Sequence, residues 1–198
     1  MGYDALRMSR ADRERWEAKH RGNATESGPA SDFLVEHAHL LIAGCTLDLA
    51  AGTGRNAAFL SARGHMVIAV DVSWAGLAHV RAAAPRVACV QMDLDAPGFR
   101  AGTAANVVVV SFLDRRLFAQ VACWLRPGGV LLWDTFLVDQ RTIGHPREAA
   151  FLLGRGELVE RLRGEFRILV SREGLVEDQG RPAFRSGVVA RRVAVEEG

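Results

Sequence analysis

The chain has 198 residues, of which 49% are hydrophobic and 24% are charged, and its formal net charge is +2 at pH 7. This length fits a single domain, and the balanced charge lacks the concentrated basic stripe of nucleic-acid-binding proteins. The N-terminus is charged from its first residues, unlike a signal peptide, and no apolar run approaches the ~20 residues of a membrane span. We expect a cytoplasmic globular protein, a monomer or homodimer, that binds neither nucleic acid nor a membrane.

The N-terminal part of the sequence predicts two helices joined by a loop. Residues 9–19 are polar and charged and predict a short helix with Ser9 as its N-cap. Residues 22–30 are rich in Gly, Asn, Thr, Ser and Pro and predict a loop. A second helix is expected over residues 31–41.

From residue 45 onward, short apolar runs alternate with helical segments. The apolar runs predict strands, and the segments between them have helical periodicity and helix-ending residues. Repeated strand–helix units of this length are typical of a parallel sheet with helices on both faces. The predicted strands are residues 45–50, 65–71, 86–93, 106–113 and 130–138, and the predicted helices are residues 55–64, 74–84 and 115–125.

The pattern changes after residue 138. Residues 139–156 predict a polar loop and residues 157–163 a short helix. Residues 165–178 and 185–195 predict two strands with only a loop between them, which favours an antiparallel pair. The expected fold is a single α/β domain with a Rossmann-like doubly wound sheet of about seven strands, mostly parallel, ending in a C-terminal antiparallel hairpin.

A glycine-containing turn between the first predicted strand and its helix is the strongest local signal. The stretch LDLAAGTGRN, residues 47–56, runs from a strand through small residues into a helix. Glycines permit a tight turn and let a ligand approach the backbone, where the free N–H groups of the helix start lie alongside. Gly52, Gly54 and Ala57 also satisfy the pattern G-x-G-x-x-G/A, so the glycines alone do not separate a nicotinamide dinucleotide from S-adenosylmethionine.

Three aspartates in or just after successive strands help to distinguish these two cofactors. Asp48 lies inside the first strand, four residues before Gly52, where a carboxylate suits an ammonium group and would repel a pyrophosphate. Asp71 ends the second strand, where a carboxylate can accept hydrogen bonds from both ribose hydroxyls. Asp93 follows the third strand, within reach of an adenine amino group, and we favour it over Asp95 for that role. Together they predict acceptors for an amino acid, a ribose and a base.

These stretches resemble the class I S-adenosylmethionine-dependent methyltransferases. The resemblance rests on LDLAAGTGRN, VIAVDVS, QMDLDA and LRPGGVLLWDTF, in the family's order, and covers roughly residues 31–135. Ala50 departs from the family, whose glycine-rich motif more often begins with glycine. A narrower likeness, carried by RERWEAKHRG, FLDRRLF and FLLGRGELVERL, is to tellurite-resistance-type methyltransferases and related small-molecule enzymes.

The resemblance implies S-adenosylmethionine as cofactor, with S-adenosylhomocysteine as product. It also implies an N-terminal lid-like segment over residues 1–30, a cofactor-binding core over 31–138, and a substrate loop and hairpin over 139–198. In that family arrangement the N-terminal segment folds over the cofactor, and Arg21 meets the cofactor's carboxylate. The expected cofactor-binding residues are Trp16, Arg21, Asp48, Ala50, Gly52, Thr53, Gly54, Asn56, Asp71, Val72, Asp93, Leu94 and Ser111.

The acceptor side is less marked in the sequence. Ser111 and Phe112 end the fourth strand and should line the site, because ligands of open α/β sheets bind outside the carboxyl ends of the strands. His145 and Arg141 lie in the long loop beyond the fifth strand and are the catalytic candidates; no metal site is expected. The Asn/Asp-Pro-Pro-Tyr/Trp motif of enzymes that methylate exocyclic or amide nitrogens is missing, which favours a thiol, a metalloid oxyanion or a hydroxylated metabolite as acceptor.

Two other functions stay open from the residues. A nicotinamide-dependent oxidoreductase would normally continue into a catalytic half, and this chain ends in a predicted hairpin. A non-catalytic S-adenosylmethionine-binding module would have the same aspartates, since they report binding and not turnover. Further expectations are that the cysteines are small buried hydrophobes in a reducing compartment and that the arginines of the tail form a solvated face; these residues are Cys45, Cys89, Cys123, Arg185, Arg191 and Arg192.

Overall fold

The structure is a computed structural model that describes residues 10–22 and 28–193, so the expected N-cap Ser9 lies outside the described residues. The helices are α1 (Arg10–Gly22), α2 (Asp32–His37), α3 (Arg55–Ala62), α4 (Trp74–Ala83), α5 (Leu117–Trp124) and α6 (Glu157–Leu162), with 3-10 turns at Ala38–Leu40, Val138–Thr142 and Ala149–Phe151. The strands are β1 (Cys45–Leu49), β2 (Met66–Asp71), β3 (Ala88–Gln91), β4 (Ala104–Val110), β5 (Leu125–Phe136), β6 (Phe166–Asp178) and β7 (Arg181–Arg192).

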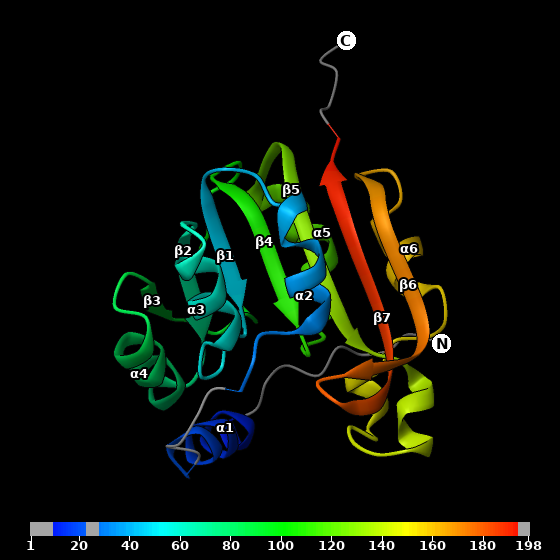
Figure 1. The fold of residues 1–198 in the computed structure, drawn as a ribbon, viewed down its shortest axis with the longest axis horizontal. Helices are drawn as coiled ribbons and strands as arrows, with labels where there is room; N and C mark the ends of the chain where they lie inside the picture. Colours follow the sequence, from blue (N-terminus) through cyan, green and yellow to red (C-terminus); the bar gives the residue numbers. More distant parts are fainter. Residues whose placement is uncertain (1–9, 23–27, 194–198) are drawn as a thin grey trace.

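One sheet of seven strands forms the centre of the molecule, in the order β3-β2-β1-β4-β5-β7-β6. The strands from β1 to β5 pair in parallel, whereas β7 runs antiparallel to both β5 and β6. Figure 1 shows the sheet face-on, with the carboxyl ends of β1 and β4 at its lower edge. The predicted mostly parallel sheet with a C-terminal antiparallel hairpin is confirmed.

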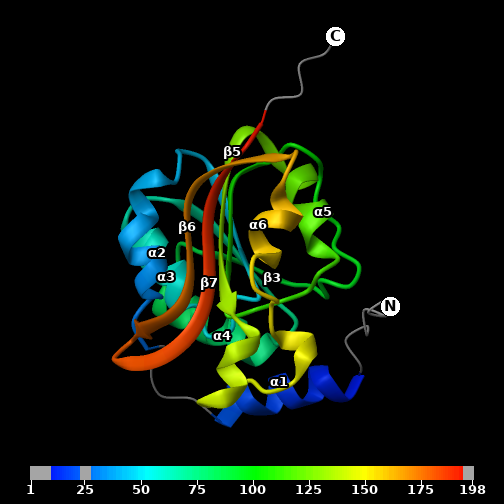
Figure 2. The ribbon, with the colours of Figure 1, turned by 90° about the vertical axis from the view of Figure 1, so that its right-hand side faces the viewer.

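Each face of the sheet packs against its own helices, as the edge-on view in Figure 2 shows. Because side chains alternate along a strand, Val107 and Val109 of β4 face one side, while Val108 and Val110 face the other. All seven residues of β4 are buried, as expected for a strand covered on both faces. The first core contains residues of α5 and α6, and the second contains residues of α2, α3 and α4.

Several elements differ from the prediction in extent. The edge strand β3 ends at Gln91, the partner of Asp71, because its one neighbour β2 ends there. Strand β5 begins at Leu125, before the predicted Arg-Pro-Gly-Gly turn, and the register against β4 shifts across that turn. The predicted loop 139–156 contains 3-10 turns and is tied to β5 by a bridge between Leu137 and Leu153. In each case the extent of the element follows the backbone pairing with its neighbour.

Two expectations about single residues are wrong. Cys123 is exposed on α5, while Cys45 and Cys89 are half-buried, so the cysteines are not uniformly core residues. Arg185 is fully buried, although Arg191 is exposed as expected. Arg185 is buried because β7 lies between β5 and β6, and carboxylates surround its guanidinium.

Three segments far apart in sequence gather at the carboxyl edge of the sheet. Helix α1, the loop after β5 and the β6–β7 hairpin tip all lie there in Figures 1 and 2. The hairpin tip is fixed to the start of α2 and to the segment before it, because Gln179 N donates to Asp32 Oδ2 at 2.7 Å and Gln179 Nε2 to the Pro29 carbonyl at 2.8 Å. None of the helices in the described ranges is long and apolar enough to cross a membrane.

Candidate functional site

The turn after β1 is built from residues with left-handed backbone conformations. Ala50, Gly52 and Gly54 have φ angles of 53°, 56° and 85°. A Cβ on Gly54 would lie 2.5 Å from Val80 Cγ2, so only glycine lets the turn approach α4. Ala50 occupies a conformation that costs a residue with a side chain about 1–2 kcal/mol, which explains why glycine is favoured at this position of the resembled motif.

Asp48 is a buried carboxylate directly beneath this turn. It is 1% exposed, and its Oδ2 has no hydrogen-bond partner among the described residues. Burial, and after it the negative charge of Asp71, raises the pKa of Asp48 to about 7, although the Ala57 amide and the Arg55 charge oppose the shift. A cation that reached this oxygen would remove both the missing hydrogen bond and the unfavourable burial of charge.

Asp71 holds the turn through its carboxylate. Its Oδ2 accepts from Gly52 N at 2.7 Å, and its Oδ1 accepts from Ser73 N at 2.8 Å. Ser73 Oγ in turn accepts from Gly76 N at 3.1 Å, so Ser73 is the N-cap of α4. Each carboxylate oxygen has a second lone pair, so Asp71 can still accept hydrogen bonds from a ligand hydroxyl.

His20 of α1 lies against the same turn and was not among the predicted site residues. A Cβ on Gly76 would lie 2.9 Å from His20 Nδ1, and one on Gly52 would lie 3.6 Å from Nε2. The imidazole is 8% exposed, and burial lowers its pKa, while the nearby charge of Asp71 opposes that shift. The sequence signal was weak, because a histidine in a charged helix has no apolar stripe to mark it as buried.

Polar contacts fix α1 across the ends of β2 and β3. Glu17 Oε2 accepts from Ser73 Oγ at 2.8 Å and from Ala75 N at 3.1 Å, so it caps the start of α4. Arg13 pairs with Asp93 at 2.8 Å, which brings the predicted adenine acceptor into contact with the N-terminal helix. Helix α1 is therefore held against the ends of β2 and β3.

The two N-terminal residues predicted to bind the cofactor differ in surroundings. Trp16 is half-buried, and its ring centroid lies 5.7 Å from that of His20. Lys19 Nζ lies 4.3 Å from the Trp16 ring centroid. The Arg21 side chain is 75% exposed and pairs with Glu17 at 3.1 Å. Trp16 therefore lies beside His20 on α1, whereas Arg21 points to solvent.

A buried group of charges lies beyond the carboxyl end of β4. Asp134, Arg172, Asp178 and Arg185 form what we term the arginine–aspartate cluster. Arg185 Nε donates to Asp134 Oδ2 at 2.7 Å, and Arg185 Nη1 lies 3.1 Å from Asp178 Oδ2. Arg172 Nη2 lies 3.1 Å from Asp134 Oδ1. Arg185 Nη2 also reaches Ser111 Oγ at 3.1 Å, so the cluster is joined to the predicted site.

The remaining predicted residues differ in how far they are buried. Asn56 is buried, and its Oδ1 accepts from Ser31 N at 3.0 Å, which holds the segment before α2. His145 and Arg141 are both exposed on the loop after β5. Leu94 is buried, whereas the other predicted or lining residues are partly exposed: Thr53, Val72 and Phe112.

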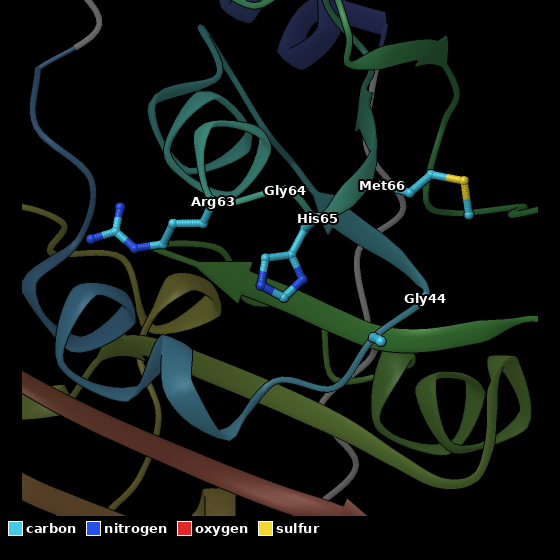
Figure 3. A pocket seen from close by; sticks show the side chains of 6 residues that line it. Gly44, Arg63, Gly64, His65 and Met66 are labelled. Carbon is cyan, nitrogen blue, oxygen red and sulfur yellow. The ribbon is translucent and has the colours of Figure 1, made fainter.

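A separate hollow of about 330 Å³ lies at the opposite edge of the sheet (Figure 3). It is lined by residues at the starts of β1 and β2, among them Gly44, His65 and Met66. Ligands of open α/β sheets bind at the carboxyl ends of the strands, and this hollow is at the amino ends. The glycine-containing turn is therefore the better candidate site.

Comparisons with known proteins agree with this geometry. Residues 46–129 match the family model of a methyltransferase domain. A SAM-dependent methyltransferase from Methanosarcina mazei has a similar structure, with a TM-score of 0.68 and 18% identity over 81% of this chain and 98% of that chain. The fold is that of a class I methyltransferase. A search of curated proteins finds no match.

Other enzymes share this methyltransferase fold. TehB from Haemophilus influenzae has a TM-score of 0.70 and 18% identity, over 89% of this chain and 67% of that chain. Geranyl diphosphate C-methyltransferase from Streptomyces coelicolor A3(2), solved with S-adenosyl-L-homocysteine, has a TM-score of 0.63 and 17% identity, over 82% of this chain and 74% of that chain. The family match and these neighbours support S-adenosylmethionine-dependent methyl transfer with S-adenosylmethionine as the cofactor, and they favour no single acceptor.

Proposed function

We propose that this protein is an S-adenosylmethionine-dependent methyltransferase that acts on a small-molecule acceptor. The observation that carries the proposal is the buried Oδ2 of Asp48, which has no hydrogen-bond partner among the described residues and lies beneath the glycine-containing turn. A buried carboxylate oxygen without a hydrogen bond is unfavourable in the free protein, and a cation that pairs with it offsets that cost. The ammonium group of S-adenosylmethionine is such a cation, whereas the pyrophosphate of a nicotinamide dinucleotide would be repelled.

The other cofactor contacts follow the order of the strands. Asp71 would accept hydrogen bonds from the ribose, and Asp93 would face the base. His20 and Trp16 of α1 would cover the cofactor from outside, since His20 lies beside the turn and Trp16 lies beside His20. The predicted roles of Ala50, Gly52 and Gly54 are to keep the turn close enough for backbone contact.

When bound, S-adenosylmethionine supplies a methyl group already activated on a sulfonium, which departs as a neutral thioether. The protein's task is then to align the acceptor with the methyl group and to exclude water. A general base is needed only where the acceptor must lose a proton during attack. The site agrees with this requirement. Asp48, the predicted partner of the cofactor's ammonium group, is buried, and Ser111 is exposed at the acceptor side. The two catalytic candidates, His145 and Arg141, are both exposed.

A methyl-transfer assay tests this function. The purified protein would be incubated with methyl-labelled S-adenosylmethionine and a panel of thiols, phenols and metalloid oxyanions, with nucleic acids and proteins as competing acceptors. We expect label transfer to at least one small molecule, with formation of S-adenosylhomocysteine. Transfer to RNA, DNA or protein alone would contradict a small-molecule acceptor, and cofactor binding without any transfer would favour a non-catalytic module.

A further inference from the structure

Unsatisfied polar atoms mark the arginine–aspartate cluster as more than a structural ion pair. Arg172 Nε, Asp178 Oδ1 and Arg185 Nη1 are buried and have no hydrogen bond within the described part of the chain; Nη1 faces Asp178 as an ion pair without hydrogen-bond geometry. Each buried donor or acceptor left without a hydrogen bond costs about 1–3 kcal/mol. Of these atoms, the Arg172 Nε donor belongs to a partly accessible side chain and is the one that an anionic ligand could satisfy; Asp178 Oδ1 is an acceptor, and Arg185 is fully buried.

The charges around the cluster favour an anion as that ligand. Within the cluster, two arginines balance two aspartates. Arg55 adds a further positive charge at the start of α3, and the charges that act on its pKa include those of Asp178, Arg185 and Asp134. Burial is the largest influence on Arg55 and lowers its pKa, while the charge of Asp178 opposes that shift. Asp48 also acts on Arg55, but our proposed function assigns that carboxylate to the cofactor's ammonium group.

The cluster reaches the edge of the sheet where an acceptor would approach. Ser111 is exposed at the end of β4, and its hydroxyl accepts the hydrogen bond from Arg185 Nη2. The Arg172 side chain is 22% exposed, whereas Arg185 and Asp134 are fully buried. Ser111 and Arg172 are therefore accessible, and the buried pair can act only through them.

Aromatic rings and ion pairs hold these accessible groups in place. Arg172 lies 4.4 Å from the Phe33 ring centroid, and Arg185 lies 4.5 Å from that of Phe136. Asp134 binds both guanidiniums, one through each carboxylate oxygen. A guanidinium fixed in this way loses little conformational entropy on binding an oxyanion, and its planar donors match the geometry of a carboxylate.

We propose that the methyl acceptor carries a carboxylate or another oxyanion, which Ser111 and Arg172 contact while Arg185 positions them through Ser111 and Asp134. The inference rests on the proposed methyl-transfer function and specifies its acceptor. The anionic group anchors the acceptor at the ends of β4 and β5. Its nucleophilic atom is a separate group that faces the methyl donor.

Matched acceptor pairs test this proposal. One pair is 3-mercaptopropionate and its methyl ester, and the other is 4-hydroxybenzoate and its methyl ester; each pair keeps the nucleophile and removes the charge. The readout is kcat/KM from S-adenosylhomocysteine release. We expect the wild-type enzyme to prefer the carboxylate of a methylated pair by about tenfold or more, the size of one charge-assisted hydrogen bond.

Variants separate a recognition role from a structural one. Arg172→Gln should bring the ratio near unity with unchanged affinity for S-adenosylhomocysteine, and Arg172→Lys should restore part of it. The double variant Asp134→Asn/Arg185→Gln removes one charge of each sign, so the net charge of the cluster is unchanged, and it should also lose the preference. The matched control is Arg191→Gln, an exposed arginine of β7, which should keep the wild-type ratio.

Different outcomes would contradict the anionic acceptor and the proposed methyl-transfer function. Equal kcat/KM for a carboxylate and its ester in the wild type, or a preference that survives Arg172→Gln, would overturn the anionic acceptor and leave methyl transfer intact. Failure of the folded wild type to bind S-adenosylhomocysteine or to release it with any acceptor would instead overturn the proposed function.

Discussion

The imidazole of His20 lies so close to α4 that a Cβ on Gly76 would sit 2.9 Å from its Nδ1 atom. The same Cβ would lie 2.7 Å from the Gly52 carbonyl oxygen. Alanine normally stabilises a helix by about 1 kcal/mol relative to glycine. Here the steric conflict with a backbone oxygen should prevail. We expect Gly76→Ala to lower the free energy of unfolding by about 1–3 kcal/mol and to weaken S-adenosylhomocysteine binding, measured by urea denaturation and calorimetry.

The control for this substitution is Gly98→Ala, because a Cβ on Gly98 meets nothing within 4 Å. Its stability and cofactor affinity should match those of the wild type. If Gly76→Ala behaved in the same way, α4 would not approach the Gly52 carbonyl oxygen as closely as the structure has it.

Asp48 should make the stability of the free protein fall as the pH rises. Its pKa is about 7 in the folded protein against the ordinary aspartate value of 3.8, so between these pH values the folded form holds a proton that the unfolded chain has lost. The stability that this group contributes is fully present below the unfolded pKa and is lost as the pH rises through about 7. Asp48→Asn should therefore flatten the pH dependence of unfolding over this window, as measured by urea denaturation.

The affinity for the cofactor should depend on pH in the opposite direction to the stability. The ionised carboxylate binds an ammonium group, so wild-type affinity for S-adenosylhomocysteine should rise from about pH 6 to about pH 8, across the folded pKa of Asp48. Asp48→Asn should weaken binding at the upper end of this range by about tenfold or more. Unchanged affinity in this variant would show that Asp48 does not contact the ligand.

Arg115 ties the segment after β4 to α6. Its Nε and Nη2 donate to Glu157 at 2.6 and 2.8 Å, and Nη2 also donates to the Leu152 carbonyl at 2.9 Å. This bidentate, partly buried pair should contribute more than a surface ion pair, so Arg115→Ala should lower the free energy of unfolding by about 1–3 kcal/mol. The control Arg161→Ala removes a 52% exposed partner of the same glutamate and should change stability by at most about 0.5 kcal/mol.

Glu17 should determine whether α1 stays docked. Its hydrogen bond from Ser73 is the largest cause that lowers its pKa below 4.5, so its contribution is present above that pH and is lost as the pH falls through the folded value. Glu17→Gln should increase amide hydrogen exchange in residues 13–22 with little effect on β4. Glu14→Gln, an exposed residue of the same helix, is the comparison. Equal exchange in both variants would argue against the capping role.

The sequence predicted the sheet because periodicity is a local property. The alternation of apolar runs and helices, the left-handed positions at Gly52 and Gly54, and the N-cap at Ser73 are each encoded within a few residues. Contacts between distant segments were not predictable in this way. His20 meets Gly76 over 56 positions, and Arg185 was expected on a solvated face because the pairing of β7 with Asp134 of β5 has no local signal.

The most direct test of the central claim is calorimetric titration of the folded protein with S-adenosylhomocysteine, repeated with Asp71→Asn and with NADH as the competing ligand. We predict saturable one-site binding of S-adenosylhomocysteine, weakened in the variant, and no binding of NADH. Binding of NADH but not of S-adenosylhomocysteine to a protein shown to be folded would contradict the cofactor assignment and, with it, the methyltransferase function.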